Sequence, residues 1–214
     1  MRILILGAAG QTSRMLTELI RKETDYDLNL FARNGHNRLK VEDSQREKIL
    51  NGDFHDADAL KEAMKDVDVV YLNDMADVDA MKNIVNVMEE SNVNRLIGAT
   101  VLGLYDEVGG NFKEWNERMF IHTPNFPLHK EAADVIEDSE LNYTLLRLTW
   151  LYNEDGNEDY ALTQKGETFI GAQVTRQAAA RLALDIIQST DGSFDRASVG
   201  VSEPNTDFAK PSFY

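Results

Sequence analysis

The sequence predicts one α/β domain built around a parallel β-sheet with helices on both faces. Short apolar runs with strand character alternate with helical patterns along the chain, and this alternation is typical of parallel strands joined by right-handed crossovers. The first such unit, residues 1–23, joins a strand to a helix through a glycine-rich turn. The 214 residues, of which 43% are hydrophobic, suffice for one sizeable core, so we expect a single domain covering residues 1–214.

The glycine-rich turn has the features of a phosphate-binding loop. An apolar strand over residues 3–6 ends at Gly7, and residues 15–20 carry apolar side chains at helical spacing. Between them stands GAAGQTS, residues 7–13. Glycine lets a ligand touch the backbone, and the N–H groups at the start of a helix attract phosphate. A purely structural turn is the alternative. No Gly-Lys-Ser/Thr follows, which excludes a P-loop.

The composition excludes several partners and kinds of site. Lys and Arg total 22 against 37 Asp and Glu, a net charge of −15, which opposes nucleic-acid binding. The chain has no cysteine, so disulfides, thiolate catalysis and zinc–thiolate sites are excluded. No apolar run reaches membrane-spanning length, and a strand begins directly after Met1 and Arg2 with no cleavage site. We therefore expect a cytoplasmic protein with no membrane partner.

The end of the second predicted strand, residues 28–32, bears on the choice of cofactor. Arg33 stands there, where an acidic residue would bind the ribose hydroxyls of NAD and an arginine suits the 2′-phosphate of NADP. Residues 28–41 contain no acid but include Arg33, His36, Arg38 and Lys40. We therefore predict NADP(H), with NAD(H) as the other cofactor and a solvated basic loop as the non-binding alternative.

The third unit predicts contacts to the adenine. A short strand over residues 46–50 leads to Asn-Gly-Asp-Phe at 51–54, and a helix begins near Asp56. Asp53 and Phe54 then lie at the carboxyl edge of the sheet, beside the adenine. Asp53 can accept from the adenine amino group, or it serves only to stabilise a turn.

The middle of the chain continues the alternation. Strands are predicted over residues 67–72, 95–100 and 142–148, with helices over 78–90 and 128–138. Five acids between residues 66 and 79 match no metal-ligand spacing, so we predict no metal site. The loop 101–106 is expected to border the nicotinamide end of the cleft. Residues 108–127 are rich in aromatic and turn residues, which favours a pocket wall or lid.

The last segment, residues 149–214, differs in character from the repeated units. Aromatic residues precede a helix near 176–188, and a short strand follows at 197–201. The segment is too short for an independent domain. We expect it to fold over the carboxyl edge as a short C-terminal region that covers the substrate.

These landmarks together resemble the atypical short-chain dehydrogenase/reductase superfamily, in particular its single-domain NAD(P)H-binding branch of NmrA-like and biliverdin reductase B-like proteins. The resemblance covers almost the whole chain. It is carried by GAAGQT at 7–12, FAR at 31–33, NGDFHDADAL at 51–60, DVDVVYLN at 66–73, RLIGATVLGLYDE at 95–107 and LNYTLLRLTWL at 141–151. It implies a Rossmann fold. The cofactor site that it implies comprises Gly7, Gly10, Gln11, Thr12, Ser13, Arg33, Asp53, Phe54, Asn73 and Thr100.

Two departures from the family pattern matter. The third glycine of the turn is Ser13, which is still small enough for close helix–strand packing. The Tyr-x-x-x-Lys pair is absent, and its place is taken by Phe-Pro-Leu-His-Lys at 126–130. Phenylalanine cannot donate a proton, which disfavours alcohol dehydrogenation. Hydride transfer to a flavin, quinone or similar conjugated acceptor does not require that acid. We therefore predict an NAD(P)H-dependent reductase of such a small-molecule acceptor.

The remaining site residues follow from this chemistry. Thr100 can hydrogen-bond the acceptor or the carboxamide, and Lys130 can contact the ribose or a developing anion. The aromatic side chains of Tyr105, Trp115 and Trp150 can stack on a flat ring. Each has an ordinary alternative: the end of a strand for Thr100, a solvated helix position for Lys130, and the core for the aromatic residues.

Two other functions stay open at this point. The phenylalanine at 126 suits a non-catalytic, NAD(P)H-sensing interaction protein of the NmrA-like type. An NAD-dependent epimerase or dehydratase ranks third, because those chemistries also use the missing tyrosine. The sequence leaves open a homodimer and a regulatory protein partner.

Overall fold

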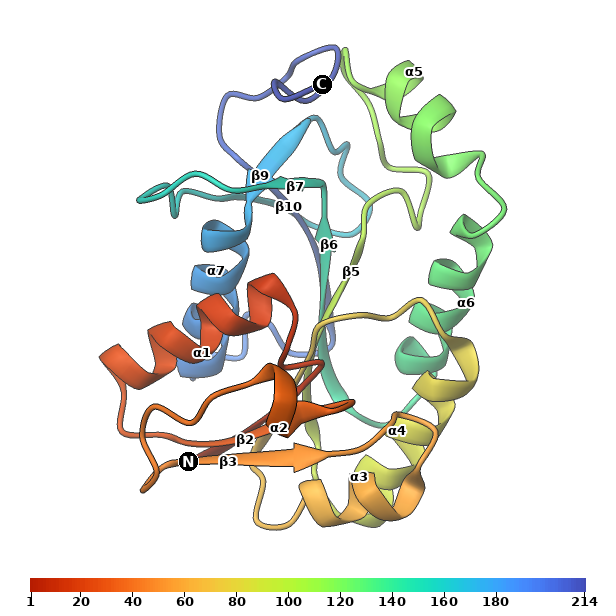
Figure 1. Cartoon of the computed structure of the whole chain (residues 1–214). Coiled ribbons are helices and arrows are strands. Elements are labelled where there is room, and N and C mark those ends of the chain that lie inside the picture. Colours follow the sequence, from red (N-terminus) through yellow and green to blue (C-terminus); the bar gives the residue numbers. More distant parts are fainter.

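The first strand, β1 (Arg2–Leu6), sends alternate side chains into two separate cores. Ile3 and Ile5 pack in one core, and Leu4 and Leu6 pack in the other. A strand that is apolar at every position belongs in a sheet covered on both faces. In this computed structural model, which describes residues 1–214, β1 indeed lies inside an eight-stranded sheet with the order β3-β2-β1-β4-β5-β6-β10-β8 (Figure 1).

The predicted parallel sheet is confirmed for all neighbouring strands except the last pair. Its other strands are β2 (Asp27–Ala32), β3 (Glu47–Asn51), β4 (Val69–Leu72), β5 (Arg95–Val101), β6 (Asn142–Leu148), β8 (Ala161–Thr163) and β10 (Ala197–Ser202). The edge strand β8 runs antiparallel to β10. Three residues are too few for their pattern to indicate a direction. A separate parallel pair consists of β7 (Trp150–Tyr152) and β9 (Gln173–Thr175).

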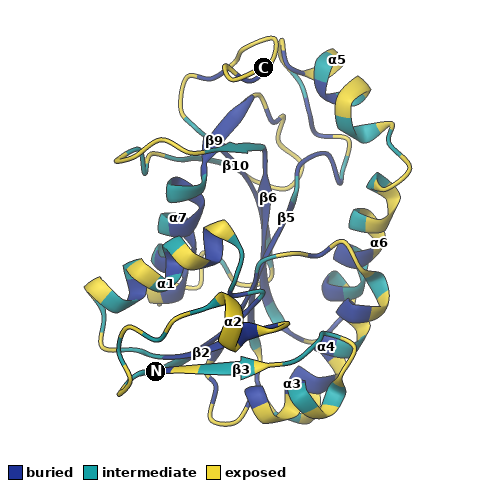
Figure 2. Cartoon of the chain, in the orientation of Figure 1, coloured by how far each residue is buried: buried dark blue, intermediate teal, exposed yellow.

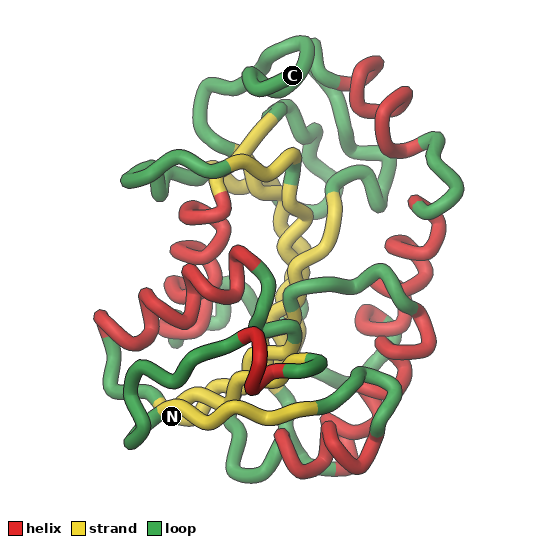
Figure 3. Tube along the Cα trace, viewed as in Figure 1, coloured by secondary structure: helices red, strands yellow, loops and turns green.

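Helices cover both faces of the sheet (Figure 3). Helices α1 (Gln11–Glu23) and α7 (Arg176–Gln188) share one core with the sheet. Helices α3 (Ala57–Ala63), α4 (Val78–Glu90) and α6 (Phe126–Glu137) share the other. The connections contain α2 (Gly35–Arg38), α5 (Lys113–Asn116) and one turn of π-helix (Glu117–Ile121). Figure 2 shows the buried strands at the centre and exposed outer faces on the helices.

The caps of the helices explain where several of them begin. Asp56 precedes α3, and its carboxylate accepts from the Ala59 N–H at 3.0 Å. Asp77 caps α4 in the same way, by accepting from the Ala80 N–H at 3.0 Å. Such caps satisfy N–H groups that a helix leaves free at its start.

None of the helices is both long and apolar enough to cross a membrane.

The C-terminal segment 149–214 divides between two places. Contrary to the expectation that all of it folds over the carboxyl edge, α7 and β10 belong to the central layers. Apolar positions of α7 such as Leu182 and Ile186 are buried against the sheet and α1, and β10 pairs with β6 in parallel. Burial of this apolar stripe is what holds α7 in the layer. The start of β7 and the first residue of α7 remain at the edge, where they line a cavity.

A buried ion pair fixes the loop that follows β5. The Arg147 guanidinium on β6 pairs with the Glu107 carboxylate, and both side chains are almost wholly buried. Glu107 also accepts the N–H groups of Gly103 and Tyr105, each at 3.0 Å. Burial acts to raise the pKa of Glu107, but the Arg147 charge and these N–H groups outweigh it and hold that pKa below its ordinary value of 4.5. The loop at residues 102–107, which follows β5, is therefore tied to β6.

Candidate functional site

Two adjoining cavities lie at the carboxyl edge of the sheet. One, of about 340 Å³, lies at the ends of β1, β2, β3 and β4. The second, of about 370 Å³, lies at the ends of β4, β5 and β6. Asn73 and Asp74, which follow β4, line both of them. The order of the strands reverses between β1 and β4, beside which both cavities lie. Doubly wound sheets bind their ligands at such a switch point.

The glycine turn forms one wall of the first cavity. Gly7 has a φ of +79°, a conformation that favours glycine. A Cβ at Gly10 would lie 2.4 Å from Asn73 Nδ2, so the Asn73 side chain would have to move to make room for it. No side chain caps α1, whose first turn holds no acid, and the N–H groups of residues 11–13 donate to no acceptor in the chain. The start of α1 therefore offers free donors and positive helix-dipole charge to an anion.

The side chains next to this turn have different surroundings. Gln11 is exposed, and its Oε1 accepts from Asn153 Nδ2 at 3.2 Å. The side chains of Thr12 and Ser13 are buried between α1 and the sheet. Thr12 and Ser13 therefore face the anion site with their backbone N–H groups rather than with their hydroxyls. The buried Ser13 shows that a small residue suffices at the third glycine position.

The basic and aromatic residues predicted for the adenosine end gather in the first cavity. Arg33, Arg38, Asp53 and Phe54 all line it. The Arg33 side chain is 76% exposed, and its Nε lies 3.7 Å from Asp53 Oδ2. Arg38 donates to the Arg33 carbonyl at 3.3 Å. Asp53 also accepts from the His55 N–H at 3.0 Å, so it stabilises its own turn as well.

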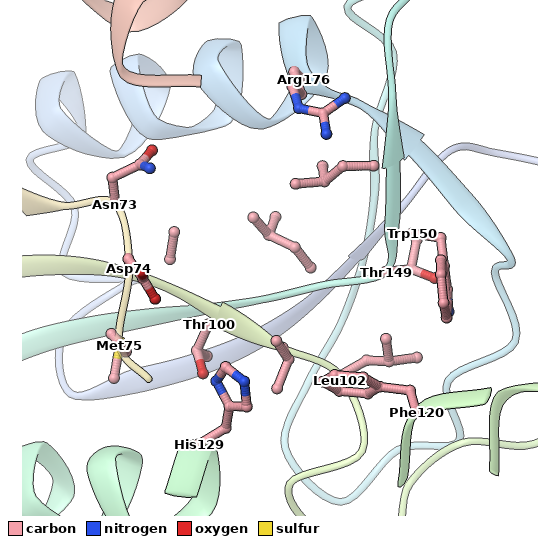
Figure 4. Close-up of a pocket in the computed structure, with 14 residues that line it drawn as sticks. Asn73, Asp74, Met75, Thr100, Leu102, Phe120, His129, Thr149, Trp150 and Arg176 are labelled. Atoms are coloured by element: carbon pink, nitrogen blue, oxygen red, sulfur yellow. The ribbon is translucent and has the colours of Figure 1, made fainter. Parts of the chain in front are cut away.

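The second cavity has a mainly apolar wall (Figure 4). Strand ends β5 and β6 contribute Thr100 and Leu148, the π-helix contributes Phe120, and β7 contributes Trp150. Trp150 is held in place by its indole N–H, which donates to Asn116 Oδ1 at 2.9 Å. The full lining is Asn73, Asp74, Met75, Ala99, Thr100, Val101, Leu102, Phe120, His129, Leu148, Thr149, Trp150, Leu151 and Arg176. Apolar walls with a few polar groups are typical of sites for flat organic ligands.

Polar atoms without a partner occur on the walls of both cavities. They are Asn73 Oδ1, Thr100 Oγ1 and His129 Nδ1, which are buried and make no hydrogen bond within the chain. Buried polar atoms normally find a partner, and leaving one unpaired is costly. Burial lowers the pKa of His129 below 6.5, and the nearby Asp74 charge offsets this only in part. The imidazole is therefore mostly neutral at pH 7 and can both donate and accept.

Three residues predicted for the acceptor site lie outside the second cavity. The Lys130 ammonium lies 3.8 Å from the Asp134 carboxylate, on a half-exposed side of α6. The Tyr105 hydroxyl lies 2.7 Å from Glu137 Oε1, away from the cavity. Trp115 packs behind Trp150, with ring centroids 4.8 Å apart. Of the aromatic residues predicted to contact the acceptor, the structure places only Trp150 on the wall.

Helix α6 brings a residue to the cavity that sequence reasoning did not select. His129 lines it, whereas its neighbour Lys130 does not. Successive residues of a helix point about 100° apart, so both cannot face the same cavity. Phe126 instead packs beside Phe120, with ring centroids 5.5 Å apart. The spacing of His129 and Lys130 from Phe126 gives no signal that separates them, because positions three and four residues further along a helix lie on the same side.

Arg176 and Phe120 were also missed. Arg176 is the first residue of α7, and Phe120 belongs to a π-helix that no periodicity predicted. The expectation of a pocket wall within residues 108–127 is met by Phe120. No local pattern marks Arg176, which reaches the cavity only because α7 packs beside α1.

The fold and the site together define a dinucleotide-binding protein of the Rossmann class. The strand order, the uncapped start of α1 and the close approach at Gly10 fit a dinucleotide lying across the switch point. Residues 7–190 match a family model described as NAD(P)H-binding. The chain therefore belongs to the NAD(P)H-binding oxidoreductase family of atypical short-chain dehydrogenase/reductase proteins.

Three known proteins show how far the similarity extends. A short-chain dehydrogenase/reductase from Veillonella parvula DSM 2008, solved in complex with NADP, is 35% identical and superposes with a TM-score of 0.93 over 99% of both chains. ChuY, described as an anaerobillin reductase from Escherichia coli O157:H7, shares the fold at 18% identity with a TM-score of 0.75, over 99% of this chain and 100% of that one. YhfK of Bacillus subtilis (strain 168), described as an uncharacterized sugar epimerase, is 21% identical over 168 residues, 73% of this chain and 75% of that protein.

Proposed function

We propose that the protein is an NADPH-dependent reductase that passes a hydride to a flat, conjugated acceptor of the flavin or quinone kind. One observation carries the proposal. The basic cavity at the glycine turn continues through Asn73 and Asp74 into an apolar cavity with an aromatic wall and no tyrosine. The description of ChuY as a reductase, on the same fold, adds support.

Residues of the first cavity would hold the cofactor. The free N–H groups at the start of α1 suit the pyrophosphate, and Arg33 with Arg38 suits the 2′-phosphate. Phe54 and Asp53 would flank the adenine, and Asn73 and Thr100 would face the nicotinamide end. When bound there, the nicotinamide supplies the hydride.

Residues of the second cavity would position the acceptor. Trp150 and Phe120 offer aromatic surface to a flat ring and exclude water from it. Thr100 and His129 offer hydrogen bonds to an acceptor oxygen or nitrogen on which negative charge accumulates during reduction. A reduced flavin or quinone can take its proton from water, so Phe126 is compatible with this chemistry.

Titration and turnover together test the proposal. We expect calorimetric titration at one salt concentration to show tighter binding of NADPH and NADP⁺ than of NADH. We also expect steady NADPH oxidation with members of a panel of flavins and quinones, followed at 340 nm. Tight NADPH binding with oxidation by none of the acceptors would contradict the reductase proposal.

The second candidate function is an NADPH-sensing interaction protein. It is favoured by Phe126, which leaves the cavity without the family's proton donor. This candidate requires different affinities for NADPH and NADP⁺ and a protein partner bound in only one of the two states. An epimerase is less well supported, because no tyrosine lines the cavity.

The His129→Phe variant is expected to lower kcat for acceptor reduction by roughly tenfold or more, because the charge that develops on the acceptor loses one hydrogen-bond donor. The Kd for NADPH should change far less than kcat, because His129 does not line the first cavity, where the phosphates and the adenosine would lie. Steady-state kinetics and calorimetry check both expectations. Lys130→Met is the matched comparison, and its ammonium faces Asp134 rather than the cavity. A loss of kcat in Lys130→Met but not in His129→Phe would contradict the proposed role of His129.

A further inference from the structure

Arg176 is the one cationic side chain that is charged at neutral pH on the wall of the second cavity. It enters from the start of α7, on the side opposite His129 and Thr100 (Figure 4). No carboxylate lies within 4.0 Å of its guanidinium. The chain carries 37 acidic residues, so acidic partners are abundant, and an arginine left without one beside a cavity is informative.

The Arg176 guanidinium is oriented by one hydrogen bond and is not neutralised. Its Nη1 donates to Asn153 Oδ1 at 3.2 Å, which is its only hydrogen bond. Asn153 in turn contacts the start of α1, because its Nδ2 donates to Gln11 Oε1 at 3.2 Å. The remaining N–H donors of Arg176 stay free for a fork-shaped contact with a carboxylate or phosphate.

Partial burial destabilises the charged Arg176 guanidinium unless an anion binds beside it. Arg176 is half-buried, and burial lowers the pKa of its guanidinium with no acidic group to offset the effect. An arriving anion would restore the lost electrostatic stabilisation, and it would do so most effectively in a cavity with apolar walls. The cavity therefore combines an aromatic wall with one unpaired, oriented cation.

We propose that Arg176 binds an anionic group of the acceptor, so that the acceptor is a conjugated ring system carrying a carboxylate or phosphate. The proposal rests on the proposed reductase function. The other source of such an anion is the cofactor itself, whose pyrophosphate is already served by the start of α1. An acceptor role and a cofactor role for Arg176 have different consequences in binding and kinetics.

FMN and riboflavin are a matched pair of probes, because they share one ring system and differ by a phosphate. In the wild type, we expect the KM for FMN to be about tenfold below that for riboflavin, as a charge-assisted contact implies. Arg176→Gln should raise the KM for FMN to that of riboflavin and leave the Kd for NADPH unchanged. Arg176→Lys keeps the charge but loses the fork-shaped pair of donors, so its KM for FMN should lie between those of the wild type and Arg176→Gln.

Arg118→Gln is the control for long-range charge, because Arg118 is exposed and lies outside both cavities. It should leave both KM values unchanged. Equal KM values for the two flavins in the wild type would overturn the proposal. A raised Kd for NADPH in Arg176→Gln with an unchanged KM for FMN would also overturn the proposal, because it would assign Arg176 to cofactor binding.

Failure of the reductase function itself would give a different result. If neither flavin supports NADPH oxidation, the reductase function is contradicted. Direct binding measurements then test whether Arg176 binds an anion. Flavin fluorescence during titration of NADP⁺-saturated protein should still show FMN bound about tenfold more tightly than riboflavin, with the difference lost in Arg176→Gln. Equal binding of both flavins would overturn the anion site.

Discussion

Replacing Arg33 by aspartate is expected to weaken NADPH binding by about tenfold to a hundredfold, because a charge-assisted contact to the 2′-phosphate becomes repulsion. Arg33 is 76% exposed at the rim of the first cavity, so the loss should come from the ligand contact and leave folding intact. Binding of NADH, which lacks the phosphate, should change little. Calorimetric titration of the variant with both nucleotides measures the ratio.

Lys40→Asp is the matched control for Arg33→Asp. Lys40 belongs to the same acid-free stretch but does not line the cavity, and its ammonium lies 3.0 Å from Glu42. It reproduces the change in net charge without the proposed contact, and we expect NADPH affinity close to that of the wild type. Equal losses of NADPH and NADH affinity in Arg33→Asp would contradict the role in 2′-phosphate binding.

Replacing Arg147 by methionine is expected to lower the free energy of unfolding by about 3–5 kcal/mol, because it leaves the Glu107 carboxylate buried without its cation. Thermal and urea unfolding measure the loss. The double variant Arg147→Met with Glu107→Leu removes both charges and should recover most of it, since a buried ion pair often adds little beyond an apolar replacement. A single variant as stable as the wild type would contradict this account.

The pH dependence gives the prediction for Arg147 a second readout. In the wild type the pKa of Glu107 is held below 4.5. Its contribution to stability is therefore present above pH 4.5 and is lost as the pH falls through the lowered pKa. In Arg147→Met the charge that lowers this pKa is gone, while burial and the two N–H groups remain, so the pKa of Glu107 should rise relative to the wild type. The variant should then gain stability relative to the wild type as the pH falls, which unfolding curves at several pH values would show.

Local pattern was enough for much of the fold and for residues that line the first cavity. The predicted bounds of helix 78–90, helix 176–188 and strand 142–148 agree with α4, α7 and β6. Arg33, Asp53 and Phe54 were predicted from their positions after strands, and the structure gathers them in one cavity. This succeeds because parallel strands end at one edge, so a residue that follows a strand is placed by the order of the strands alone.

The wall of the second cavity depended on contacts between distant residues. Thr100, Phe120, His129, Trp150 and Arg176 come from five elements and meet only because those elements pack at one edge. No sequence pattern distinguishes His129 from Lys130 as the residue that faces inward, since this depends on how α6 is rotated against the sheet. The same holds for the aromatic stretch at 108–127 and for Tyr105 and Trp115. Their residue types were evident from the sequence, but the direction in which each side chain points was not.

The sequence by itself determined the parallel sheet, the glycine turn at the start of a helix, the basic residue after the second strand and the absence of the family's tyrosine. These features follow from short-range periodicity and from residue types at strand ends, which act over a few residues. Only the tertiary structure decided that α7 and β10 join the central layers, that Glu107 pairs with Arg147, and that His129 and Arg176 face each other across one cavity. The physical reason is that the burial of apolar surface, summed over the whole chain, sets how each helix is rotated and docked.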